Sequence, residues 1–525
     1  MQENEVVNYI KKAFEYKEHE CYKQAIEMLY KVLETESDNI EILFQIGELY
    51  VLLHNYNRAV QYLEKVLVID AKHLPSLKLL LKVYLRQDEL QDAKKLALSA
   101  YEIEKSPANL KSLVKILGEL KDFDEIEKYK DDECMDSSCL YAWAEASYKS
   151  GKVKEAKELI EKACSLDNNN ADCKVLLGKI YFDESEFDKS REIFESFGKN
   201  SQDADVLNYL GLFALEDTNF VEAIKFFSRA SNIDKNNPVY FYNLGNAYFF
   251  NGWHEEAVNA YQKAICLKPD NADYRYSLAY LLFEDKEFDK AKKEVDIVLE
   301  NNPEHYQARV LAALLKFENK DFLGAQKILE ENIKDGSQDD FTLISLGKVY
   351  SELDIFEKAE RVTSEVIDRN PDNLNYKSSL ADIYIKEKKF DRALEIVKEL
   401  LSANERYISG CILGAKAAYL KADMELAKKY AQDAISLDIN CSEGYYYLAL
   451  VRVSQKDYEE AIECMKRAIT YDINNAKYYA EMSNIYKLKE DIKTAFEYIK
   501  EAESIDNSTE YKIMYRELAA LNRKL

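Results

Sequence analysis

The sequence predicts an all-α fold: a right-handed superhelical solenoid of about fifteen helix–turn–helix units, followed by a C-terminal capping helix. Three observations predict it. A small residue recurs every 34 residues along most of the chain, a second small residue stands twelve positions before it, and polar connectors separate the units. A fixed period of roughly 20–50 residues is the mark of stacked repeats. A chain of 525 residues is also too long for one hydrophobic core, since single cores stop growing near ~250–300 residues.

Each unit is predicted to contain two amphipathic helices that cross at the small residues. Apolar residues recur at the i, i+3, i+4, i+7 spacing of a helix with one buried face. Large side chains at the crossing would hold the backbones apart, so alanine or glycine lets them approach, and aromatic residues fill the space on either side. In the longest run the spacing is 34 residues throughout, and the small residues are Ala223, Ala257, Ala291, Ala325, Ala359, Ala393, Ala427, Ala461 and Ala495.

Polar connectors mark where one unit ends and the next begins. In the connector at residues 370–373, Pro371 ends one helix and Asp372 or Asn373 caps the next. We therefore expect the units to begin near residues 6, 40, 74, 107, 137, 171, 204, 238, 272, 306, 340, 374, 408, 442 and 476. Residues 510–525 carry one apolar stripe, as expected of the capping helix that a solenoid requires.

The register breaks once, in the fourth unit. Ile126 stands where a small residue is expected, and the interval from Ile126 to Ala156 shortens to 30 residues. Residues 131–139 are polar, and the unit is short of a full second helix. The break indicates either a hinge or a drifted unit that still stacks. We predict three blocks: residues 1–136 with units 1–4, residues 137–509 with units 5–15, and the capping helix at 510–525.

The most regular unit spans residues 238–271 and reads PVYFYNLGNAYFFNGWHEEAVNAYQKAICLKPDN. It carries Leu-Gly, Tyr, Gly, Ala, Tyr, Ala and Pro in the order of the tetratricopeptide repeat family, which the chain resembles over nearly its whole length. The resemblance implies that the first helix of each repeat lines a concave groove, with repeat positions 5, 9, 12 and 13 facing inward.

At these inward positions the third and fourth units carry a basic stripe. Its residues are Lys78, Lys82, Arg86, Lys111 and Lys115, and Lys149 and Lys179 would extend it. A spacing of i, i+4 and i+8 puts the first three residues on one face of one helix. Such a stripe would clamp the carboxylates of an acidic segment or of a chain terminus. The alternative is a solvated face, since lysine is a good helix former.

The eighth and ninth units carry an aromatic set at the same positions. Its residues are Tyr242, Asn246, Phe250, Tyr276 and Tyr280. Aromatic rings supply large contact areas at low entropic cost, and an asparagine amide can bond both groups of a bound peptide backbone. The alternative is packing between repeats. The Lys/Asn clamp by which some family members hold chaperone tails is not matched, because Tyr242 and Ser277 stand where its Lys and Asn would be.

Composition excludes several classes of function. The formal net charge of −24 argues against general affinity for nucleic acid or anionic membranes. No apolar stretch approaches the ~20 residues that span a bilayer, so membrane insertion is not expected. Nine scattered cysteines, an odd number without a CxxC motif, indicate reduced thiols, and with an acidic start unlike a signal peptide they predict a cytoplasmic protein.

No catalytic constellation is present in the sequence. There is no phosphate-binding Gly-rich loop, no GxSxG and no HExxH, and the five histidines lie apart. We therefore predict no enzymatic activity, no catalytic residues, no cofactor and no metal.

The sequence predicts a non-catalytic scaffold or adaptor that binds peptide segments of partner proteins, acidic ones among them, in its groove. One alternative is a structural core subunit of a multiprotein or self-associating assembly, which exposed apolar residues near either end would favour. A second alternative is a targeting partner of a separately encoded enzyme.

Overall fold

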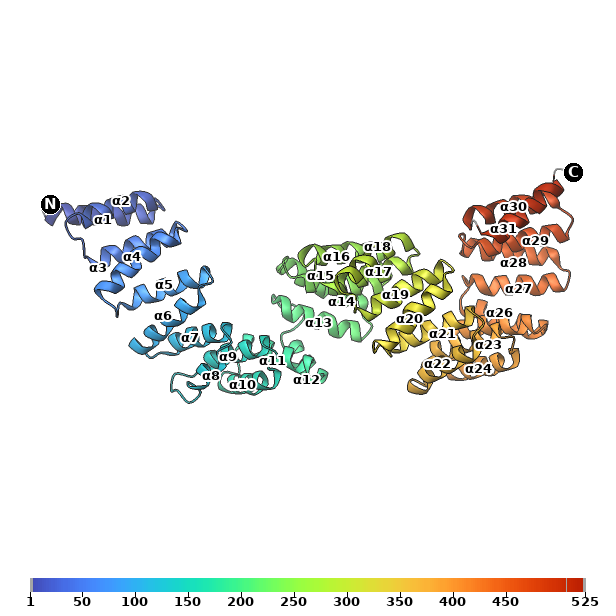
Figure 1. Cartoon of the computed structure of the whole chain (residues 1–525), viewed down its shortest axis with the longest axis horizontal. Helices are drawn as coiled ribbons and strands as arrows, with labels where there is room; N and C mark the ends of the chain where they lie inside the picture. Colours follow the sequence, from blue (N-terminus) through green and yellow to red (C-terminus); the bar gives the residue numbers. More distant parts are fainter. Residues whose placement is uncertain (1–2, 507, 523–525) are drawn as a thin grey trace. The chain divides into compact units, whose positions relative to one another are not determined.

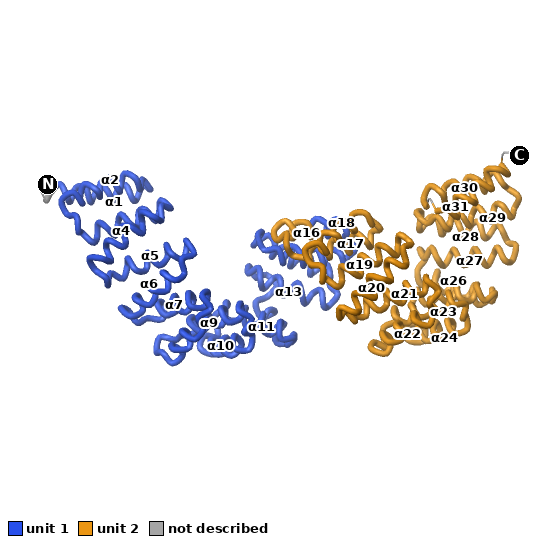
Figure 2. The backbone as a smooth tube through the Cα atoms, viewed as in Figure 1, with its two compact units in different colours: residues 1–260 blue, residues 261–525 orange. Residues whose placement is uncertain are grey.

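The computed structural model describes residues 3–506 and 508–522, and over these residues the chain is entirely helical, with thirty-one α-helices and no strand (Figure 1). Two compact units divide the chain, residues 1–260 and residues 261–525 (Figure 2). Within each unit, helices that are neighbours in sequence pack against one another, as expected of stacked repeats. The α-solenoid predicted from the sequence is confirmed.

The first unit contains eight repeats. Their first helices are α1 (Glu3–Glu18), α3 (Ile40–Leu52), α5 (Leu74–Arg86), α7 (Pro107–Glu119), α9 (Ser137–Lys149), α11 (Ala171–Asp183), α13 (Ala204–Glu216) and α15 (Pro238–Phe250). Their second helices are α2 (Tyr22–Leu33), α4 (Tyr56–Ile69), α6 (Leu90–Ile103), α8 (Phe123–Glu127), α10 (Val153–Leu166), α12 (Phe187–Ser196), α14 (Phe220–Ile233) and α16 (His254–Leu267), whose last residues belong to the second unit.

The second unit continues the series. Its first helices are α17 (Ala272–Glu284), α19 (Tyr306–Glu318), α21 (Asp340–Glu352), α23 (Leu374–Lys386), α25 (Ile408–Leu420), α27 (Ser442–Ser454) and α29 (Ala476–Leu488). Its second helices are α18 (Phe288–Asn301), α20 (Phe322–Lys334), α22 (Phe356–Arg369), α24 (Phe390–Ala403), α26 (Met424–Leu437), α28 (Tyr458–Tyr471) and α30 (Ile492–Ile505). A last helix, α31 (Thr509–Asn522), packs on α30.

Helix starts follow the polar connectors. From α3 onward every first helix begins at the residue expected from the sequence, whereas α1 begins at Glu3 rather than near residue 6. The side chains of Asn39, Asn170 and Asn271 each accept a hydrogen bond from a backbone N–H in the first turn of the helix that follows. Residues 523–525 of the predicted capping segment lie outside the described residues. The division into blocks at residue 136 stays a prediction.

The turn inside each repeat contains a residue in the left-handed region. His54 (φ 55°), Lys286 (φ 62°) and Lys388 (φ 63°) adopt this conformation two residues after the first helix ends, and Gly151 and Gly252 do so at the same place in their repeats. Non-glycine residues rarely adopt positive φ, so the surrounding packing must impose the turn. A repeat can therefore use this turn without glycine.

Small residues at the helix crossings are buried, as the period requires. Ala59, Ala223 and Ala393 have no exposed surface. At Gly211 a Cβ atom would lie 2.6 Å from the ring of Phe227, closer than carbon atoms approach in proteins. Only glycine fits there.

The fourth repeat differs from all others because its second helix, α8, has only 5 residues. As a result, α9 packs directly against α7. Ile126 on α8 is fully buried in the core that also contains Leu113 and Trp143, so the larger side chain fills space that a longer helix occupies elsewhere. Whether this repeat is a hinge stays a prediction.

The α7–α9 contact depends on Gly118, where an added Cβ would lie 2.4 Å from the Cβ of Ala146. We expect Gly118→Ala to lower the free energy of unfolding by about 1–3 kcal/mol through overpacking. Urea unfolding followed by circular dichroism measures this change. The double variant Gly118→Ala/Ala146→Gly restores the space, so it should be less destabilised than the sum of the two single variants. An unchanged unfolding curve for Gly118→Ala would show that the helices do not meet here.

Candidate functional site

The basic stripe lies on the first helices of two consecutive repeats in the first unit. Lys78, Lys82 and Arg86 are on α5, and Lys111 and Lys115 are on α7. Caps set where both helices begin: the His73 ring accepts a hydrogen bond from the Ser76 backbone N–H, and the Ser106 hydroxyl accepts one from the Asn109 backbone N–H. Because these caps set the start of each helix, they also set which face carries the lysines.

Two members of the stripe are engaged within the chain. The Lys78 ammonium donates to the Glu104 carboxylate over 2.9 Å, and the Asn109 amide donates to the same oxygen over 3.0 Å. These two hydrogen bonds, that of Lys78 first, hold the pKa of Glu104 below its ordinary value. The Arg86 guanidinium donates to the Tyr56 hydroxyl over 2.9 Å. Lys78 and Arg86 therefore tie α5 to α6 and α4.

The other three members of the stripe are Lys82, Lys111 and Lys115, which we call the free lysines. Their side chains are exposed, and none of the residues that the structure describes forms an ion pair or hydrogen bond with their ammonium groups. The candidates to extend the stripe differ, because Lys149 pairs with Glu145 and Lys179 with Asp205. The structure thus separates a fully available charge of three from a longer sequence pattern.

On α15 the aromatic set begins after an Asn237 cap, whose side chain accepts a hydrogen bond from the Val239 backbone N–H. Tyr242 and Asn246 are half-buried, and both have contacts of their own. Phe250 is 58% exposed, although its ring stacks on Phe220 at 5.9 Å. This exposure makes Phe250 the member of the set on α15 most open to a partner.

In the second unit, Tyr276 and Tyr280 lie on α17 with ring centroids 6.3 Å apart. The Tyr276 ring also lies 5.3 Å from the ring of His305, which caps α19 by accepting a hydrogen bond from the Ala308 backbone N–H. Burial, with Glu284 nearby, raises the pKa of Tyr280. These contacts place Tyr276 in the packing between neighbouring repeats.

The sequence analysis did not find a buried polar contact that joins α13 to α15. The Asn243 amide donates to the Asn208 side-chain oxygen over 2.8 Å, and both residues are buried. Asn208 stands at an inward repeat position, but it spends its side chain on this contact. Asparagine on an otherwise apolar helix face was the available signal, because a buried amide must find a hydrogen-bond partner.

The described residues contain no group of three or more His, Cys, Asp or Glu side chains arranged to hold a metal ion. Within residues 3–506 and 508–522, no helix is both long enough and apolar enough to cross a bilayer.

The engagement of Lys78 leads to a prediction about pH. In Lys78→Met the pKa of Glu104 should rise toward the ordinary value of about 4.3, because its strongest hydrogen-bond donor is gone. A carboxyl with a lowered folded-state pKa stabilises the fold above its unfolded pKa, and this contribution is lost as the pH falls through the folded pKa. Acid should therefore destabilise the wild type by more than it destabilises Lys78→Met. Carbon-13 NMR of Glu104 gives the pKa directly, with Lys82→Met as the control that leaves it unchanged. Equal Glu104 titrations in Lys78→Met and the wild type would contradict the pairing.

Models of known families match several parts of the chain. Tetratricopeptide repeat models match residues 138–170, 251–314, 442–475 and 476–509. A model of the anaphase-promoting complex, cyclosome, subunit 3 matches residues 18–100. No curated protein matches the chain.

Similar solved structures include three helical proteins of low sequence identity. The APC/C hetero-tetramer Cut9-Hcn1 is 15% identical, with 91% of this chain and 96% of that chain covered and a TM-score of 0.44. A tetratricopeptide repeat protein from Parabacteroides merdae is 20% identical, with 48% and 99% covered and a TM-score of 0.41. Yeast Tom70 is 16% identical, with 82% and 99% covered and a TM-score of 0.36.

Two of the repeat-model matches, at residues 442–475 and 476–509, coincide with the helix pairs α27–α28 and α29–α30. The helix pairs, their 34-residue period and these matches together make the chain a member of the tetratricopeptide repeat family.

Proposed function

We propose that the chain is a non-catalytic, cytoplasmic scaffold or adaptor that binds peptide segments of partner proteins, and that the basic stripe selects acidic segments. One observation carries the proposal: the free lysines Lys82, Lys111 and Lys115 are exposed without an internal partner on consecutive first helices. In a chain of net charge −24, three unpaired cations that lie close along the chain form a local exception. All nine cysteines are free thiols, in keeping with a reducing compartment.

Binding at the free lysines would be electrostatic and distributed. A single exposed ion pair contributes about 0.2–1 kcal/mol, so an acidic segment must contact several lysines to bind well. Salt screens such pairs over about 8–10 Å, so the affinity should fall as salt is added. The remaining members of the stripe, Lys78 and Arg86, would join only by giving up Glu104 and Tyr56.

The aromatic set would supply apolar contacts to bound segments. Phe250 offers an exposed ring, and Asn246 offers an amide that can bond a peptide backbone. Tyr242 on α15, and Tyr276 and Tyr280 on α17, would add ring area. We propose these residues as partner contacts on the strength of their repeat positions.

Charge reversal tests the proposal. We expect Lys82→Glu/Lys111→Glu/Lys115→Glu to lose acidic partners that the wild type captures from native cell extract at low salt, and that high salt also releases. Reversing the exposed lysines Lys23, Lys154 and Lys162 on the second helices makes the same change in net charge and should leave capture intact. Equal capture by both triple variants would remove the free lysines from the proposal. If the recovered partner is an enzyme, the chain serves as its targeting partner.

A second candidate function is that of a structural core subunit, and one observation favours it. On α1, Val7 is 65% exposed and Phe14 is 47% exposed, seven residues apart and so on one helix face. A pocket of about 120 Å³ between α1 and α3, lined by Phe14 and Ile42, adds to this apolar surface. Such surfaces mark contacts with other proteins or other copies of the chain.

If this surface mediates self-association, Val7→Asp/Phe14→Asp should convert oligomers of the wild type into monomers. Light scattering after size-exclusion chromatography measures the mass. Val68→Asp is the control, because Val68 is an apolar residue with 86% exposure that lies on α4. A wild type that stays monomeric at every concentration would exclude self-association through α1.

A further inference from the structure

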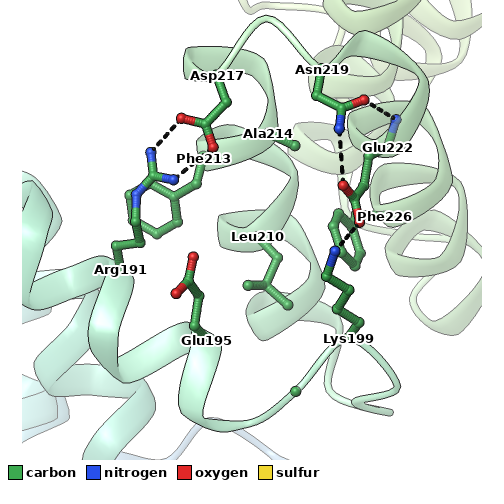
Figure 3. Close-up of a pocket in the computed structure, with 11 residues that line it drawn as sticks. Arg191, Glu195, Lys199, Leu210, Phe213, Ala214, Asp217, Asn219, Glu222 and Phe226 are labelled. Carbon is green, nitrogen blue, oxygen red and sulfur yellow. Dashed lines mark hydrogen bonds and ion pairs between the residues drawn. The ribbon is translucent and has the colours of Figure 1, made fainter.

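A pocket of about 320 Å³ lies in the first unit where α12, α13 and α14 meet (Figure 3). Its floor is apolar and consists of Leu210, Phe213 and Ala214 on α13 and Phe226 on α14. All four side chains are at least nine-tenths buried, so the pocket is a hollow over the core rather than an opening into it. The volume falls at the lower end of the range for ligand pockets in proteins.

The pocket exists because α12 ends early. This helix has 10 residues, whereas α14 in the next repeat has 14. Gly198 follows in the left-handed region (φ 75°), and a Cβ placed on it would meet no atom within 4 Å. Ten other repeats have an apolar residue at the matching position, eleven residues after the second helix begins: Leu33, Leu67, Tyr101, Ile265, Leu299, Ile333, Ile367, Leu401, Ile435 and Ile469.

These matching residues are all at least half-buried, and several pack against the core of their own repeats, among them Leu33, Ile333 and Leu401. The sixth repeat lacks such a side chain. An apolar side chain from outside the chain would therefore occupy a place that the fold normally fills from within.

Charged groups at the rim mostly neutralise one another. The Arg191 guanidinium donates two hydrogen bonds to the Asp217 carboxylate, at 2.7 and 3.1 Å, and lies 4.9 Å from the centre of the Phe213 ring. On the opposite rim, Lys199 donates to Glu222. These pairs lie across α12–α13 and across the 197–203 loop and α14, so they also define the two sides of the pocket.

Glu195 is the exception among the lining residues. Figure 3 shows its carboxylate between Arg191 and Leu210, and no described residue forms a hydrogen bond or ion pair with it. The pocket thus combines an apolar floor with one uncompensated negative charge. A ligand that satisfies both must carry an apolar group and a cation close together.

We propose that this pocket binds a helical segment of a partner protein that carries a leucine or isoleucine one turn away from an arginine or lysine. The aliphatic side chain takes the place vacated at Gly198, over Leu210 and Phe226, and the cation pairs with Glu195. Residues at i and i+4 lie on one helix face, so a single segment offers both groups at once. This site is independent of the free lysines, which lie on other repeats and would select the opposite charge.

Three designed helical peptides test the site: one with leucine and arginine at i and i+4, one with glutamate in place of the arginine, and one with alanine in place of the leucine. Fluorescence anisotropy gives their affinities. The wild type should bind the leucine–arginine peptide best, and Glu195→Gln should weaken it about tenfold, as expected for a partly desolvated charge pair. Glu195→Arg should instead prefer the glutamate peptide.

Two controls separate this site from other effects. Glu192→Arg makes the same charge change on α12 at an exposed residue outside the pocket lining, so it should keep the wild-type preference. The triple reversal of Lys82, Lys111 and Lys115 should also keep it, which distinguishes failure here from failure of the proposed function. Equal affinity of the wild type for all three peptides, or no change of preference in Glu195→Arg, would overturn the proposal. Melting curves followed by circular dichroism confirm that each variant is folded.

Discussion

The close crossing of two helices within each repeat is the constraint on which the rest of this structure depends. Buried alanine or glycine residues hold the backbones near enough for the flanking aromatic and aliphatic side chains to interlock. Gly211 shows how little space remains, since even a Cβ atom would collide with Phe227. Because every repeat solves the same packing problem in the same way, each can stack on the next without a common central core.

Irregular repeats show what happens when one part of this pattern is missing. In the fourth repeat the second helix is reduced to 5 residues, and α9 closes the gap by packing on α7 while Ile126 fills the interior. In the sixth repeat α12 stops early, but α13 and α14 keep their places and a pocket stays open. One shortened helix is compensated by its neighbours and the other is not, and only the second leaves a surface that a partner can occupy.

Charge is handled between repeats rather than within helices alone. Lys78 reaches Glu104, Lys179 reaches Asp205 and Arg191 reaches Asp217, each across 26 residues of sequence. Such exposed pairs contribute little stability individually. Their larger effect is to remove charges from the set that partners can reach, so that the lysines and the carboxylate left over, Lys82 and Glu195 among them, stand out.

The sequence by itself determined the fold class, the helix starts from residue 40 onward and the buried crossing residues, because all of these follow from local periodicity and capping along one chain segment. It also placed the basic stripe and the aromatic set on first helices. Only the tertiary structure decided which of these residues are available. Partners such as Glu104 for Lys78 and Phe220 for Phe250 lie on other helices, and their distances depend on how helices pack in space. For the same reason the pocket beside Glu195 became visible only once three helices were in place.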